Sequence, residues 1–140
     1  MATLKISDLS VGDWVGVRCG TKINAFKVEE IRFNNIIHKY VAILNNKAYG
    51  LPTTELHPIP ITAEILEKNG FVKSDDFLHK IDLPDNILLG VRRQTDGYIF
   101  ELKREKRRIG ELLVIIRGIR YIHDLQHALR LAGVDKEINL

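Results

Sequence analysis

Apolar and polar residues alternate in two-residue steps through the first sixty positions, a pattern typical of half-buried β-strands. In the clearest case, Trp14 and Arg18 share one face of segment 14–19, and Val15 and Val17 share the other. Asparagine and glycine turn signals separate the apolar segments. We therefore predict strands over residues 14–19, 25–31, 36–44 and 47–51, a 3₁₀ turn over 52–56, and a terminal strand over 57–61.

Short strands joined by tight turns over about 55 residues predict a small closed barrel, because closure removes unpaired strand edges. This first part of the chain resembles SH3-like barrels, and residues 9–15 (LSVGDWV) carry the resemblance. The resemblance implies an SH3-like barrel, which we expect to cover residues 1–61.

A short helix over residues 63–68 has complete start and stop signals in the sequence. Thr62 is a favourable N-cap residue, and Gly70 supplies the left-handed conformation that commonly ends a helix. Phe71 can then contact Leu66, as a Schellman ending requires. We expect this helix to link the barrel to the rest of the chain.

The second half returns to strand-like segments before a last helix. Asp96-Gly97 is a strong hairpin signal between segments 87–93 and 97–104. Residues 112–116 (LLVII) are apolar on both faces, which is typical of a central strand covered on both sides. We expect the C-terminal helix on one side, and the linking helix or the barrel on the other. Further strands are predicted over residues 71–73, 77–81 and 111–117.

The last predicted element is a helix over about residues 121–132, ended by Gly133. Its apolar stripe comprises Ile122, Leu125, Leu129 and Ala132, and its polar side comprises His123, Asp124, His127 and Arg130. The predicted fold class is therefore α+β: an N-terminal SH3-like small β-barrel, a short linking helix, and an antiparallel sheet packed with a C-terminal helix. We expect the two parts, residues 1–61 and 62–140, to be docked on each other.

Composition places the chain among folded globular proteins, with 45% hydrophobic and 28% charged residues in 140 positions. No apolar run approaches the ~20 residues that span a bilayer, and the first residues do not form a secretory signal. The single cysteine, Cys19, excludes an internal disulfide and is expected to be a buried, inert thiol. We expect a cytoplasmic or phage-associated protein with no membrane contact and no cofactor.

Positive charge is concentrated in residues 92–108, where seven basic and three acidic side chains give a net charge of +4. Tyr98 and Phe100 share a strand face with Arg104, and basic side chains beside aromatic rings suit phosphate contact with base stacking. The alternative is an exposed hairpin whose charges protect a sheet edge. The candidate nucleic-acid-binding residues are Arg92, Arg93, Lys103, Arg104, Lys106, Arg107 and Arg108.

Residues 123–127 spell His-Asp-Leu-Gln-His, which on a helix can point two imidazoles at one metal ion. Metalloproteases carry Glu in place of this Asp, and no third ligand follows at a recognisable spacing. We therefore expect His123 and His127 on the solvated face of a surface helix. A metal-dependent hydrolase acting through this pair is the third functional alternative.

Two stretches carry a further resemblance: residues 56–71 (LHPIPITAEILEKNGF) and residues 121–126 (YIHDLQ). Together they resemble a family of short uncharacterised proteins of Bacteroidales-type gut bacteria and of their phages and mobile elements. This family often has Asn where the chain has His127, which argues against a metal role for His127. The resemblance implies an accessory, structural or defence-related role, but no known activity.

The sequence thus predicts a non-catalytic binding or interaction protein, whose partner is another protein or a second copy of itself. Trp14, Tyr40 and Tyr49 are the candidate protein-binding aromatic residues of the barrel, and a core position is the alternative for each. Nucleic-acid binding through residues 92–108 is the second functional alternative. No catalytic residue is assigned.

Overall fold

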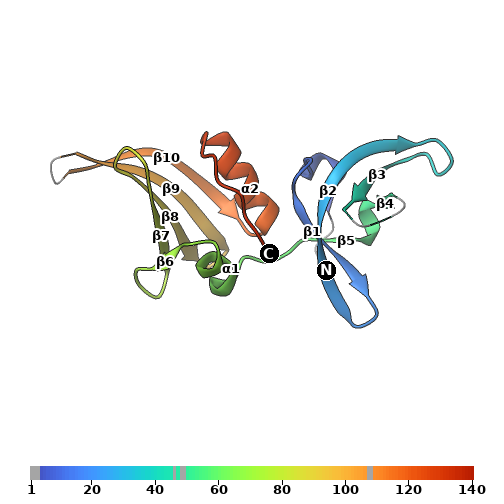
Figure 1. Cartoon of the computed structure of the whole chain (residues 1–140), viewed down its shortest axis with the longest axis horizontal. Helices are drawn as coiled ribbons and strands as arrows, with labels where there is room; N and C mark the ends of the chain where they lie inside the picture. The colour runs from blue at the N-terminus through green and yellow to red at the C-terminus, as the bar shows by residue number, and fades with distance from the viewer. Residues whose placement is uncertain (1–3, 46, 48–49, 107–108) are drawn as a thin grey trace. The chain divides into compact units, whose positions relative to one another are not determined.

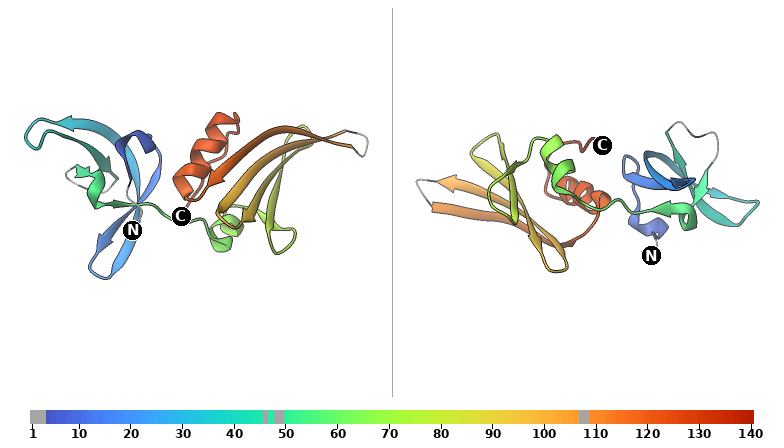
Figure 2. Two further views of the ribbon diagram at one scale, coloured as in Figure 1. Left: turned by 180° about the vertical axis from the view of Figure 1, so that it is seen from behind. Right: turned by 90° about the horizontal axis from the view of Figure 1, so that it is seen from below.

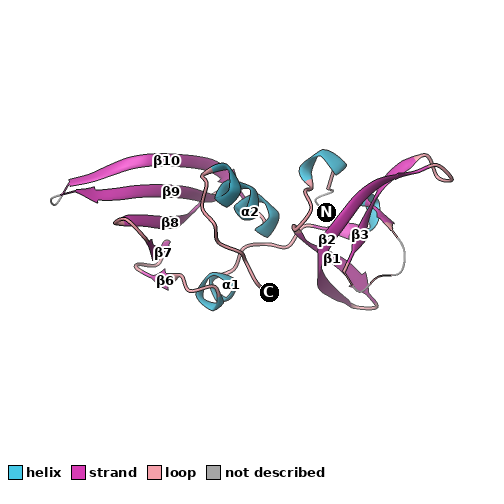
Figure 3. Ribbon diagram, turned by 45° about the horizontal axis from the view of Figure 1, so that its top comes forward, coloured by secondary structure: helices cyan, strands magenta, loops and turns pink. Residues whose placement is uncertain are grey.

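The computed structural model describes residues 4–45, 47, 50–106 and 109–140, and the chain divides into two compact units, residues 1–60 and 61–140 (Figure 1). Strands are the main regular elements of both units, and the helices are short (Figure 3). The predicted fold class is confirmed: a curled N-terminal sheet, a short helix, a second antiparallel sheet and a C-terminal helix. Within the described ranges, none of the helices has the length and apolar character needed to span a bilayer.

The first unit is a strongly curled, five-stranded antiparallel half-barrel, consistent with an SH3-like barrel. Its strand order is β4-β3-β2-β1-β5. The bounds are β1 Trp14–Cys19, β2 Lys22–Asn34, β3 Lys39–Leu44, β4 Leu51–Pro52 and β5 Leu56–His57, with 3₁₀ turns η1 Ile6–Asp8 and η2 Thr53–Glu55.

The first sheet curls along β2, which is long enough to pair with two neighbouring strands. Residues 22–27 of β2 pair with β1, and residues 28–34 pair with β3. A bulge between Val28 and Glu30 lies at the change of partner and adds to the local bend. The curled sheet encloses a core of apolar side chains: Leu4, Leu9, Val15, Val17, Val28, Ala42, Leu44, Leu51 and Leu56.

Several details predicted for the first unit are wrong. β4 covers Leu51–Pro52 rather than residues 47–51, of which 48 and 49 lie outside the described residues. β5 covers Leu56–His57 rather than 57–61, because Pro58 and Pro60 have no N–H to donate to a strand ladder. β3 begins at Lys39 rather than at residue 36, because Asn34 Oδ1 accepts hydrogen bonds from the N–H groups of Ile36 (2.9 Å) and Ile37 (3.3 Å) and closes a turn. Ile36 is 89% exposed in this turn. Cys19, the expected buried thiol, is exposed because it is the last residue of β1 and lies beyond the core positions of that strand.

The second unit is a five-stranded antiparallel meander with the order β10-β9-β8-β7-β6. Helix α1 contacts β6 and β7, and helix α2 lies beside β10 (Figure 2). The centre of the core is the pairing of β8 with β9, where Leu89 lies opposite Leu102 and Val91 opposite Phe100, all buried. The bounds are α1 Ala63–Lys68, β6 Val72–Lys73, β7 Leu78–Leu83, β8 Ile87–Gln94, β9 Gly97–Lys106, β10 Ile109–Ile119 and α2 Ile122–Leu131.

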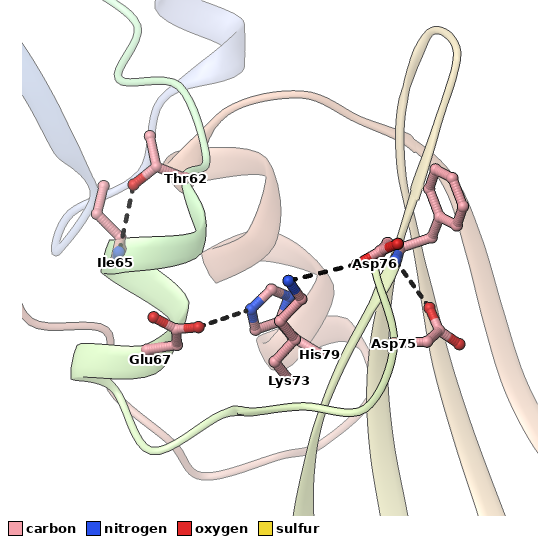
Figure 4. Close-up of polar contacts among 8 residues, drawn as sticks. Thr62, Ile65, Glu67, Lys73, Asp75, Asp76 and His79 are labelled. Carbon is pink, nitrogen blue, oxygen red and sulfur yellow. Dashed lines mark hydrogen bonds and ion pairs between the residues drawn. The ribbon is translucent and has the colours of Figure 1, made fainter.

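Helix α1 begins and ends as predicted. Thr62 Oγ1 accepts a hydrogen bond from the N–H of Ile65 at 3.2 Å (Figure 4). At the other end, Gly70 has a φ of 87°, and the N–H of Phe71 donates to the carbonyl oxygen of Leu66 at 3.0 Å. Leu66 and Phe71 are both buried, as a Schellman ending requires.

Polar contacts tie α1 to the sheet and to the C-terminal residues. His79 of β7 is buried, and its Nε2 lies 3.4 Å from Oε1 of Glu67 in α1 (Figure 4). Asn69, also buried, donates from Nδ2 to the carbonyl oxygen of Asn139 and accepts at Oδ1 from the N–H of Asn139, both at 2.8 Å. Ile138, which precedes Asn139 in the sequence, is also buried. Residues 138 and 139 therefore belong to the fold of the second unit.

Strand β10 contradicts the arrangement predicted for the second sheet. It lies at the edge, with β9 as its neighbour, instead of at the centre. Val114 and Ile116 lie opposite the buried residues Leu102 and Phe100, but the other side of the apolar run is exposed. β10 lies at the edge because the sheet is a meander, in which each strand pairs with the one before it in the sequence. The last strand is therefore the outermost.

Candidate functional site

The predicted basic segment does not form one patch. Arg93 lies opposite Tyr98 at one end of the β8–β9 pair, whereas Arg104 lies opposite Ile87 at the other end. The separation along β9 is about 20 Å, because each strand residue advances the chain by about 3.4 Å. Lys103 Nζ lies 3.4 Å from a carboxylate oxygen of Glu101, which is on the same strand. Arg107 and Arg108 lie outside the described residues, as does the side chain of Lys106.

Arg92 and Arg93 lie at the end of β8, and Arg93 lines a cavity of about 760 Å³. Arg93, Arg117 and Arg120 line this arginine cavity, together with one acidic residue, Asp96. Sequence reasoning missed Arg117 and Arg120, which fall outside the segment with excess charge. The β8–β9–β10 meander brings them to Arg93 across more than twenty residues of chain.

Tight packing of the β8–β9 turn on the end of β10 shapes the arginine cavity. A Cβ atom at Gly97 would lie only 2.6 Å from the carbonyl oxygen of Ile119, so the two backbones are in close contact. Tyr98 also lines the cavity, and its hydroxyl donates to the carbonyl oxygen of Ile61 at 3.3 Å, which orients the ring. Phe77 adds an exposed aromatic ring. Guanidinium groups beside aromatic rings suit a phosphate or carboxylate attached to a planar group.

The outer edge of β10 is the second candidate surface. Leu112 is 52% exposed, Leu113 37% and Ile115 40%. Leu112 and Ile115 lie opposite Lys103 and Glu101 on β9, on the side of the sheet away from the buried Leu102 and Phe100. Bulges follow Leu112 and Ile116. The β10 edge, residues 109–119, thus combines exposed apolar side chains with a strand side that β9 does not pair.

The three aromatic candidates of the first unit differ in their surroundings. Trp14 is half-buried, and Lys27 Nζ lies over its ring at 5.3 Å from the centroid. Tyr40 is 53% exposed and meets the ring of Phe33 edge-on, with 5.2 Å between centroids. Tyr49 lies outside the described residues. Of the two candidates that the structure describes, Tyr40 is the more accessible.

Helix α2 places His123 in the interior, so the predicted solvated position is wrong for this residue, which is 3% exposed. Its ring stacks on Tyr121 at 5.8 Å between centroids and meets the edge of His127 at 5.9 Å. Asp124 Oδ2 accepts hydrogen bonds from the N–H groups of Arg120 and Tyr121, so this carboxylate caps the helix. In the described residues, no three His, Cys, Asp or Glu side chains gather as metal ligands. The buried face of α2 is wider than the apolar stripe: Ile122, His123, Leu125, Gln126, Ala128 and Leu129.

Comparison of the chain with family models, with curated proteins and with solved structures found no match. The resemblance of residues 56–71 and 121–126 to a family of mobile-element proteins therefore stays a prediction. The arginine cavity and the β10 edge of the second unit are the two surfaces from which a function is proposed below.

Proposed function

We propose that this protein is a non-catalytic binding protein that attaches to another protein through the β10 edge. The observation that carries the proposal is an edge strand of 11 residues with an exposed apolar run. An open edge offers N–H and C=O groups to a further strand, and apolar side chains on that strand gain free energy by burial. The partner segment is an extended chain with apolar side chains of its own.

The composition of the β10 edge supports this function. Proteins usually protect an exposed edge strand with charged side chains or prolines. β10 has neither between Glu111 and Arg117, where five consecutive residues are apolar. The bulges after Leu112 and Ile116 shorten the regular part of the edge and so oppose open-ended strand stacking. We therefore expect specific and reversible strand addition.

We also propose that the first unit is an SH3-like barrel, and that the protein is an accessory component of a phage or mobile element in the cytoplasm of its host. The curl and strand order of the first sheet support the barrel assignment. The resemblance of residues 56–71 and 121–126 supports the biological context. Neither assignment supplies an activity by itself.

A pair of isoleucine substitutions tests binding through the β10 edge. Ile115→Lys places a charge in the exposed apolar run, and Ile36→Lys makes the same change in an exposed turn of the first unit. Tagged chains are used to capture partners from a nuclease-treated lysate of the native host, and the partners are identified by mass spectrometry. We expect Ile36→Lys to capture the same partners as the wild type, and Ile115→Lys to lose them. Identical partner sets for all three chains would exclude the β10 edge as the binding surface.

Nucleic-acid binding is the second candidate function, and the arginine cavity is the observation that favours it. Three guanidinium groups and two aromatic rings line one cavity, Arg93, Arg117, Arg120, Phe77 and Tyr98. If these arginines contact three phosphates of a single strand, the logarithm of affinity should fall with a slope of about −2 against the logarithm of salt concentration. An electrophoretic shift assay with single-stranded oligonucleotides at low salt measures this binding.

The control for this assay is an arginine of the first unit. Arg32 donates hydrogen bonds to the Glu30 carboxylate at 2.9–3.0 Å, and this hydrogen bonding lowers the pKa of Glu30. Arg93→Glu and Arg32→Glu change the net charge equally, but we expect only Arg93→Glu to abolish the complex. Equal weakening by both variants would indicate a general charge effect, and no complex with the wild type would end the nucleic-acid hypothesis.

A further inference from the structure

We infer that the strand added to the β10 edge is β10 of a second copy of this chain, and that the two strands run antiparallel. This inference rests on the proposed function of the β10 edge. The two five-stranded sheets would join into one continuous sheet across a two-fold axis. Because such an interface is isologous, β10 must be complementary to itself.

The charges that flank the apolar run provide this self-complementarity. Glu111 lies at one end of residues 112–116 and Arg117 at the other, and both are exposed. Antiparallel alignment brings Glu111 of each copy to the end of the run that carries Arg117 of the other copy. Parallel alignment would bring like charges together, which is unfavourable. The charge pattern therefore favours a second copy in the antiparallel direction.

The apolar side chains of the edge provide the area that is buried. Leu112, Leu113 and Ile115 of each copy are exposed and would be covered together. One strand from each side gives a small interface compared with the roughly 1,600 Å² of stable complexes. The bulges after Leu112 and Ile116 shorten it further. We therefore expect a reversible dimer that forms as protein concentration rises.

Sedimentation equilibrium of the full chain over a range of concentrations, at low salt, tests the antiparallel pairing. All chains carry Cys19→Ser, because the exposed Cys19 could form disulfide-linked dimers. Glu111→Arg and Arg117→Glu should each weaken the dimer about tenfold or more, since each places like charges at both ends of the run. An equimolar mixture of the two variants should restore association, because each arginine then faces a glutamate of the other variant. Circular dichroism checks that both variants are folded.

A second pair of variants controls for net charge. Glu30→Arg and Arg32→Glu make the same charge changes in the first unit, and each alone should dimerise as the wild type does. If the mixture of Glu111→Arg and Arg117→Glu stays dissociated, antiparallel pairing of β10 is wrong.

A wild-type chain that is monomeric at every concentration would exclude the second copy as the partner. The capture experiment with Ile115→Lys then separates two cases. Loss of captured partners would leave the β10 edge as a site for a different protein, whereas no effect would reject the proposed function as well.

Discussion

Replacing Asn69 by alanine should destabilise the second unit, because it removes three hydrogen bonds around the end of α1. Asn69 Nδ2 donates to the carbonyl oxygens of Ile65 and Asn139, both at 2.8 Å, and Oδ1 accepts from the N–H of Asn139 at 2.8 Å. Net contributions of about 0.5–1.5 kcal/mol for each bond give a range of about 1.5–4.5 kcal/mol. Asn139 is exposed, so water can replace the lost partners there, and we expect about 2 kcal/mol.

This loss is measured by unfolding the chain in urea, with hydrogen exchange of the β8 and β9 amides as the signal for the second unit. Tryptophan fluorescence does not serve here, because the single tryptophan, Trp14, lies in the first unit. Asn139→Ala is the matched control. The bonds of Asn139 to Asn69 use main-chain atoms, so this variant should change the free energy of unfolding by less than about 0.5 kcal/mol. Equal losses in the two variants would refute the hydrogen bonding assigned to Asn69.

Thr62→Ala should lower the free energy of unfolding by about 1 kcal/mol in urea, because it removes the N-cap hydrogen bond of α1, whereas Thr62→Ser should retain most of it. Gly97→Ala should cost about 2 kcal/mol or more in thermal unfolding, because φ is 132° and the new Cβ would meet the carbonyl oxygen of Ile119 at 2.6 Å. Gly110→Ala is its control, because the new Cβ would meet no described atom within 4 Å apart from those of the adjacent residues. The Cys19 thiol should react with a maleimide as fast in the native chain as in urea, and strong protection would contradict its exposure.

Features that depend on a few neighbouring residues could be predicted from the sequence. Helix α1 is defined by its caps, Thr62 and Gly70, and both act as expected. The hairpin at Asp96-Gly97 is also where the pattern places it, with Gln94 opposite Gly97. Such signals work because turn and cap geometry is decided by local backbone conformation and local hydrogen bonds.

Features that depend on which elements become neighbours could not be predicted. Arg117 and Arg120 join Arg93 because of the strand order, which sequence spacing does not encode. The polarity of an imidazole predicts a solvated face for His123, yet α2 buries a wider face than its apolar stripe. The sequence predicts one basic surface over residues 92–108, although the β8–β9 hairpin separates the two ends of this segment.

The error over β10 is informative about function. A run that is apolar on both faces predicts a central strand, and residues 112–116 have that composition. Among the described residues, β9 is the only strand that pairs with β10. Composition and position agree if the missing neighbour is supplied by another chain, because β10 would then be central in the assembled sheet. In that case the apolar run is adapted to the complex, and substitutions such as Ile115→Lys should affect association far more than the stability of the single chain.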